Sequence, residues 1–168
     1  MRQRLAIVVL FLVGSVFLDS SVQAAEKKRL VGISKAQQQL YQTSSAIGDV
    51  AGHEIVQSSQ ISGNAADHPD WRNMVQKSFI QFDQTNGTGS HRGHGENLHE
   101  NGDRNYYSFQ GTHKTVLKDG GGWEQNSEGS YTLTSGTGKF KNMTGGGTYT
   151  CKFTPDGGGC NWQGDHEY

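Results

Sequence analysis

Short runs of alternating residues separated by glycine-rich breaks fill Gly129–Gly164, and they constrain the fold more than any other part of the chain. Alternation of apolar and polar residues with a period of two is typical of β-strands that bury one face. The break at Thr154-Pro155-Asp156-Gly157 suits a tight turn, because proline presets φ and glycine accepts a left-handed conformation. This stretch therefore predicts antiparallel strands joined by short turns.

The same pattern extends upstream to Ile47. Turn signals such as Gly63-Asn64 and Asn86-Gly87 divide it, and Asn-Gly suits a two-residue hairpin because both central positions need positive φ. Residues 64–74 interrupt the alternation and predict a loop or a short helical plug. Because the longer strands can bend or split, we expect an all-β fold with a single antiparallel barrel of about eight strands. The predicted strands are 49–62, 75–85, 90–100, 104–117, 122–134, 138–153 and 160–168.

The first 24 residues predict a signal peptide. Arg2 and Arg4 precede the apolar run Leu5–Leu18, and small residues at 22–24 suit cleavage before Ala25. A retained membrane anchor is the alternative, although the run is shorter than the roughly 20 residues of a helical span. The remainder fits one domain, with residues 25–46 as a linker or a short N-terminal helix and residues 47–168 as the barrel. The expected location is secreted or periplasmic.

Charge gives no sign of a polyanionic partner. After removal of residues 1–24, thirteen basic and fifteen acidic side chains remain, for a net charge of −2 with neutral histidines. A near-neutral balance lacks the basic footprint of a nucleic-acid-binding or membrane-surface protein. We therefore expect no nucleic-acid partner, no membrane association after signal removal and no cofactor. Whether the chain is a monomer or a homo-oligomer stays open.

The two cysteines, Cys151 and Cys160, flank the predicted turn at Pro155-Asp156. A hairpin there places them side by side on one face of two adjacent strands. Two cysteines in a secreted chain most simply form one disulfide. A metal pair is the rival interpretation, but no suitably spaced third ligand accompanies them.

The alternation gathers aromatic residues on one face of each strand and polar residues on the other, but it does not say which face points outward. If the aromatic face lines a barrel, it forms a ligand-binding interior that includes two histidines. These imidazoles either bind a ligand oxygen, act as acid–base groups near neutral pH, or are hydrogen-bonded core residues. The candidate interior residues are Tyr107, Phe109, His113, Trp123, Tyr131, Tyr149, Trp162 and His166. No catalytic residue is identified.

The segment His91–Glu100 contains His91, His94 and His99 and raises the question of a metal site. On a strand, His91 and His99 share a face but lie about 26 Å apart at 3.3 Å per residue. His94 falls on the opposite face. We therefore predict no metal site, with these three histidines as weak candidates.

At Ser135–Tyr149, the motif SGTGKFKNMTGGGTY resembles the Gly-Thr-Gly-Lys-Phe signature of secreted bacterial proteins with an allene-oxide-cyclase-like or dirigent-like barrel. The Asn101-Gly102-Asp103 hairpin followed by Tyr106-Tyr107, and the downstream TPDGGG turn, fit the same resemblance. It covers roughly 100–120 residues. It implies a calycin-like barrel of about eight strands with a central cavity. Because the match falls on turns and core, it carries no catalytic residue over.

Three functions follow from these patterns. The first is a secreted or periplasmic barrel that binds a small, partly apolar molecule in its interior. The second is an isomerase- or cyclase-like enzyme that uses the same cavity, with His113 or His166 as the acid–base residue. The third is a small outer-membrane barrel, against which the low hydrophobic content of 32% argues.

Overall fold

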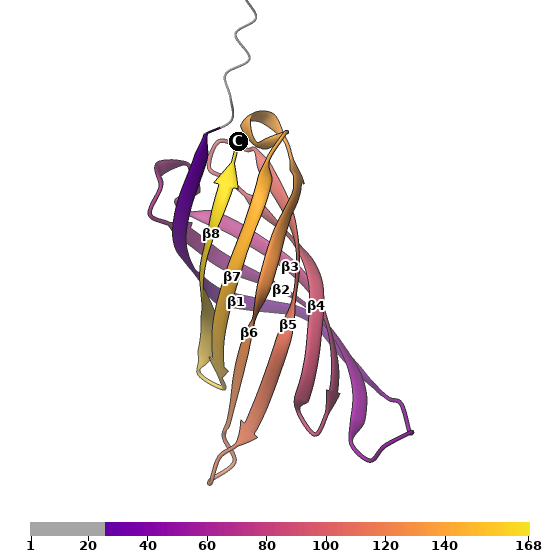
Figure 1. Cartoon of the computed structure of the whole chain (residues 1–168). Helices are drawn as coiled ribbons and strands as arrows, with labels where there is room; N and C mark the ends of the chain where they lie inside the picture. Colours follow the sequence, from indigo (N-terminus) through magenta and orange to yellow (C-terminus); the bar gives the residue numbers. More distant parts are fainter. Residues whose placement is uncertain (1–25) are drawn as a thin grey trace, which may run out of the picture.

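The computed structural model describes residues 26–168, so the predicted signal peptide 1–24 lies outside the described residues. The chain forms a closed antiparallel barrel in which each strand pairs with the next and β8 pairs with β1 (Figure 1). This confirms the all-β, eight-stranded barrel. Its strands are β1 Lys27–Ala46, β2 His53–Ala66, β3 Met74–Thr85, β4 Thr88–Leu98, β5 Arg104–Leu117, β6 Trp123–Gly136, β7 Thr144–Thr154 and β8 Gly157–Glu167.

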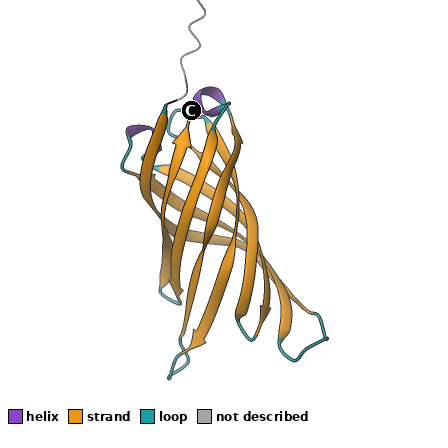
Figure 2. Cartoon of the chain, in the orientation of Figure 1, coloured by secondary structure: helices purple, strands orange, loops and turns teal. Residues whose placement is uncertain are grey.

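The two ends of the barrel are built differently. Two short 3-10 turns, η1 Pro69–Trp71 and η2 Gly138–Phe140, lie at the end drawn uppermost in Figure 2, which we call the upper end. The other end, the lower end, carries the hairpin turns β1–β2, β3–β4, β5–β6 and β7–β8 (Figure 1). At the β3–β4 turn Asn86 and Gly87 have φ of 52° and 76°, which confirms the predicted two-residue hairpin.

The aromatic face of the sheet points inward and the polar face outward. On β6, Tyr131 and Leu133 face the interior, whereas Glu128 and Ser130 are exposed. The same division holds on β7 and β8, where Tyr149 and Trp162 point inward. The structure thus settles the one question that alternation alone left open.

Residues 27–46 do not form the predicted linker or short helix, including the stretch Lys35–Tyr41. They form β1, so the barrel begins before residue 47. The first half of β1 alternates and pairs with β8 as far as Lys35. Beyond Ala36 both faces are exposed and the pairing to β2 shifts register twice. Bulges and two-sided exposure erase the period-two signal by which a strand is recognised.

Two other strands begin or end at residues that differ from the prediction. Gly63-Asn64 is not a turn, because β2 continues to Ala66 and pairs with β3 through both residues. The strand predicted from residue 138 begins at Thr144, because residues 138–140 form η2. In both places glycine lies next to a real strand end, which shifts a boundary drawn from turn residues alone.

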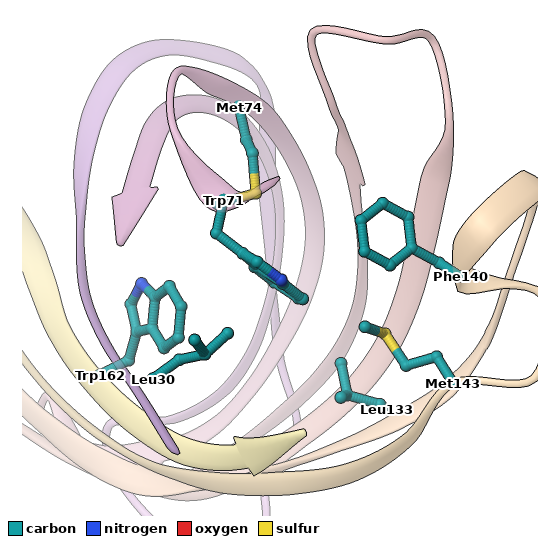
Figure 3. Close-up of a cluster of buried hydrophobic side chains, with 7 residues drawn as sticks. All are labelled: Leu30, Trp71, Met74, Leu133, Phe140, Met143 and Trp162. Atoms are coloured by element: carbon teal, nitrogen blue, oxygen red, sulfur yellow. The ribbon is translucent and has the colours of Figure 1, made fainter. Parts of the chain in front are cut away.

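The hydrophobic core fills the upper end of the barrel. Trp71, from η1, is 1% exposed and packs against Phe140, from η2, at a ring separation of 5.8 Å. Figure 3 shows these side chains directed toward one another inside the ring of strands. The predicted loop or plug is therefore present but shorter than residues 64–74, because it lies between Ala66 of β2 and Met74 of β3, with Trp71 as the inserted side chain. The full cluster is Leu30, Trp71, Met74, Leu133, Phe140, Met143 and Trp162.

Candidate functional site

Below the core cluster the barrel encloses a cavity of about 120 Å³. All eight strands contribute inward-facing side chains to it, down to Phe153 near the lower end. Trp71 of η1 covers it at the upper end. Its wall combines aromatic rings with amide, hydroxyl and imidazole groups. Among the described residues no Asp, Glu, Lys or Arg lines it. The wall of the cavity is therefore polar but uncharged.

Most of the predicted interior residues meet at this cavity. Two do not line it. His113 is buried but lies beside it, with its ring 4.9 Å from that of Phe82, a lining residue. Trp123 is 37% exposed, because it begins β6 opposite Leu117 in a hairpin that reaches past the lower end. The expectation for Trp123 is thus corrected. The residues that do line the cavity are Tyr107, Phe109, Tyr131, Tyr149, Trp162 and His166.

Glycines on neighbouring strands make room for the aromatic wall. Phe109 lies opposite Gly93, and Tyr107 opposite Gly95, across the β4–β5 pair. A Cβ atom at Gly93 would lie 2.4 Å from the Phe109 ring, and one at Gly95 would lie 2.2 Å from the Tyr107 ring. The rings lie flat over these glycines, as in aromatic pairing with strand glycines. Strand glycines are therefore part of the site, a role that sequence reasoning did not assign.

Similar contacts occur elsewhere in the wall. Tyr149 lies over Gly129, and Trp162 over Gly32. The triplet Gly145–Gly147, interpreted from sequence as a bend, lies inside β7. The missed signal was the recurrence of glycine at inward positions opposite an aromatic residue, which becomes visible only once the strand register is known.

Two buried histidines each form a hydrogen bond to a tyrosine hydroxyl in the cavity wall. His91 Nε2 lies 2.6 Å from Tyr149 Oη, and His166 Nε2 lies 2.8 Å from Tyr131 Oη. Burial lowers the pKa of both imidazoles to about 4, so both are neutral at pH 7. Burial also raises the pKa of Tyr149 and of Tyr131, which keeps both hydroxyls protonated.

His113 belongs to the same group of neutral imidazoles. Its Nε2 lies 2.7 Å from Gln84 Oε1, and burial lowers its pKa. His113 and His166 are therefore neutral imidazoles near neutral pH, the form that accepts a proton or a hydrogen bond. In each of His91, His113 and His166 the Nδ1 atom is buried and has no hydrogen-bond partner. Unpaired buried nitrogens of this kind are uncommon in folded proteins, where such groups are paired with protein atoms or with ordered water.

The three weak metal candidates do not come together. His91 and His99 both point inward from β4, but His94 is exposed on the outer face. His99 is used in the plug, where its ring stacks on Phe140 at 4.1 Å and its Nε2 lies 2.7 Å from Asn105 Oδ1. Within residues 26–168, His, Cys, Asp and Glu side chains form no group of three or more that could hold a metal ion.

The disulfide between Cys151 and Cys160 is present and lines the cavity. These residues lie directly opposite each other on β7 and β8, near the β7–β8 turn. The predicted pairing is confirmed. The disulfide fixes the wall at the lower end, where the core cluster does not reach.

Charged groups lie at the rim of the lower end. His53, at the start of β2, contacts Asp49 through Nδ1 and Asp83 through Nε2. Hydrogen bonds to the two carboxylates raise the pKa of His53, with Asp49 as the larger cause. Because a carboxylate accepts hydrogen bonds, an imidazolium with two N–H donors satisfies both partners. This contact ties the β1–β2 loop to β3.

In the part of the chain that the structure describes, no helix is long and apolar enough to cross a membrane. Comparisons with protein families, with curated proteins and with solved structures found no match in any of the three. The barrel is compatible with a calycin-like fold, and the functional argument rests on the cavity itself.

Proposed function

We propose that this protein binds one small, neutral, partly apolar molecule inside its barrel. The observation that carries the proposal is a cavity walled by aromatic rings and hydrogen-bonding groups, without an ionised side chain among the described residues. Sites for small molecules combine an apolar wall with a few polar groups that orient the ligand. An ionised ligand would lose its hydration without gaining a counter-charge.

The volume sets the size of the ligand. A cavity of about 120 Å³ is close to the roughly 150 Å³ of an apolar cavity that takes up benzene. It is smaller than the roughly 300–1,000 Å³ of pockets for drug-sized molecules. The expected ligand is therefore about the size of one aromatic ring. It enters from the lower end, where Gln125 and Phe153 are only half-buried.

The proposed place of action is the periplasm or the extracellular space. The disulfide supports it, because disulfides persist in oxidising compartments. The outward residues of β6 and β8 include Glu128, Ser130, Gln163 and Asp165, which are not the apolar belt of a transmembrane barrel. A relationship to the allene-oxide-cyclase-like barrels is part of this proposal and carries no activity with it.

Toluene binding tests the proposal. The indole N–H signals of Trp71 and Trp162, which line the cavity, are expected to shift and saturate in an NMR titration, while that of Trp123 stays in place. Ser127→Leu fills the cavity from β6 and should weaken binding at least about tenfold. Ser130→Leu, on the outer face of the same strand, is the matched control and should bind as the wild type does.

No saturable shift in the wild type would refute the proposal, and so would equal binding by the Ser127→Leu and wild-type proteins. Native mass spectrometry of protein purified from periplasm without detergent provides an independent check. A mass excess that is lost on denaturation would give the mass of the natural ligand. A single ring-sized compound is expected.

A further inference from the structure

Two of the three buried histidines whose Nδ1 atom has no hydrogen-bond partner are neighbours. His91, on β4, and His113, on β5, are 6% and 3% exposed, and their ring centroids are 5.8 Å apart. The distance between the ring centres is about twice the length of a hydrogen bond, which is about 2.8 Å. Phe82 contacts both rings, at 5.8 Å and 4.9 Å, and lines the cavity. His91 thus lines the cavity itself, and His113 lies beside the cavity, in contact with its lining residue Phe82.

The hydrogen bonds already made assign the free nitrogen of His113. Its Nε2 faces the amide oxygen of Gln84, which only accepts, so Nε2 carries the proton. A neutral imidazole with its proton on Nε2 has a lone pair on Nδ1. This buried Nδ1 is thus an acceptor without a donor.

His91 supplies the complementary group. Its Nε2 faces the hydroxyl of Tyr149, which is protonated and able to donate. When Tyr149 donates to Nε2, the single proton of the neutral His91 ring is on Nδ1, which is then a donor without an acceptor. With this assignment the donor Nδ1 of His91 lacks an acceptor, and the acceptor Nδ1 of His113 lacks a donor. The two nitrogens belong to neighbouring rings.

We propose that His91 and His113 together form a hydroxyl-binding site, and that the ligand of the cavity is a neutral compound with a hydroxyl group on an apolar ring, of the phenol type. This inference rests on the proposed function and names its ligand class. The hydroxyl oxygen accepts from His91 Nδ1, and the hydroxyl proton is donated to His113 Nδ1. A continuous series of hydrogen bonds then runs from Tyr149 through His91, the ligand and His113 to Gln84. Such series strengthen each member.

Binding of phenol, toluene and benzoate to the whole protein tests the inference, measured by calorimetry or NMR titration. Phenol is expected to bind at least about tenfold more tightly than toluene, because its hydroxyl forms two hydrogen bonds that the methyl group of toluene does not form. Benzoate is expected not to bind, because its charge finds no counter-ion in the wall. Nitrogen-15 shifts of the imidazoles give a direct readout, with a change expected at Nδ1 of His113.

The informative variants are His91→Gln and His113→Gln. A glutamine amide can occupy the place of Nε2 and keep the bond to Tyr149 or Gln84, but it has no group at the place of Nδ1. Each variant should still bind toluene and lose the preference for phenol. His94→Gln, on the outer face of β4, is the matched control and should keep that preference.

The outcomes separate the two proposals. Binding of toluene and phenol with equal affinity would overturn the histidine site and leave the binding cavity standing. A phenol preference that survives both glutamine variants would also overturn it, since the hydroxyl would then be held elsewhere. Failure of both toluene and phenol to bind would refute the proposed function itself. If a glutamine variant does not fold, the ligand series on the wild type and its nitrogen-15 shifts still decide the matter.

Discussion

The upper end of the barrel is filled with packed side chains, whereas the lower end keeps a cavity, although the same eight strands form both ends. At the upper end, η1 and η2 insert Trp71 and Phe140 between the strands, and seven apolar side chains form one continuous core (Figure 3). At the lower end Gln125 and Ser127 line the cavity, and Gln84 forms a hydrogen bond with the buried His113 beside it. The difference places most of the packing energy at one end and leaves the other free to hold a ligand.

Polar groups differ less sharply between the ends, because Asn105 Nδ2 and His166 Nδ1, both close to the plug, are also buried without a hydrogen-bond partner. In the plug, both ring nitrogens of His99 have partners, the carbonyl of Asp70 and the side chain of Asn105. Lower in the barrel, His91 and His113 each keep one nitrogen without a partner. The lower pair is distinguished by its position, because the two unpaired nitrogens belong to neighbouring rings at the cavity, where a bound molecule supplies a donor and an acceptor.

The largest effect should come from the plug. Trp71→Ala removes the side chain at the centre of the upper cluster, and such truncations cost about 3–5 kcal/mol of the free energy of unfolding. Urea unfolding measures this loss. Trp123→Ala, at the exposed start of β6, is the matched control and should cost less than about 1 kcal/mol. Similar losses for both tryptophans would remove the distinction between the ends.

Acid should destabilise the protein through the buried histidines. The pKa of His91 and of His166 is about 4 in the folded protein, against about 6.5 when unfolded. Between pH 6.5 and 4 the unfolded chain binds protons that the folded chain does not. The free energy of unfolding therefore decreases as the pH is lowered. At pH 4 each of these two histidines makes it about 3 kcal/mol smaller than at pH 7.

Urea unfolding at a series of pH values between 7 and 4 measures this slope. His91→Gln should make the decrease smaller by about 3 kcal/mol at pH 4, the contribution of one imidazole, while His113 and His166 still contribute. His94→Gln, on the outer face, should leave the slope unchanged. His53 acts in the opposite direction, since its pKa is raised and its contribution is lost as the pH increases. An unaltered slope in His91→Gln would contradict the burial argument.

A smaller effect is expected at the lower end. The double substitution of Cys151 and Cys160 by alanine opens a short loop, for which the chain-entropy relation gives a loss of roughly 2–3 kcal/mol. Urea unfolding of the variant, compared with the oxidised wild type, measures the loss. Hydrogen exchange should show faster opening of β7 and β8 near their turn, with the upper cluster still protected. Equal acceleration at both ends would show that the barrel opens as one unit.

The sequence specified the parts of the barrel that repeat locally. The alternation on β6, β7 and β8 predicted which side chains share a face, and the two cysteines flanking a turn predicted their own pairing. Both predictions depend on residues a few positions apart, where strand geometry alone relates one side chain to the next. The sequence did not predict strand β1 for the same reason, because two register shifts and an exposed second half leave no local alternation.

The candidate site needed the tertiary structure. His91 and Tyr149 are 58 residues apart, and His113 and Gln84 are 29 apart, so their contacts exist only once strand register and barrel closure are fixed. The glycines beneath Phe109 and Tyr107 likewise gain their role from a neighbouring strand. Local periodicity determined that the chain forms strands with an aromatic face. Closure of the barrel turned that face inward and brought distant strands together. Only this tertiary arrangement determined that the aromatic face lines a cavity and that buried histidines beside it keep an unpaired nitrogen.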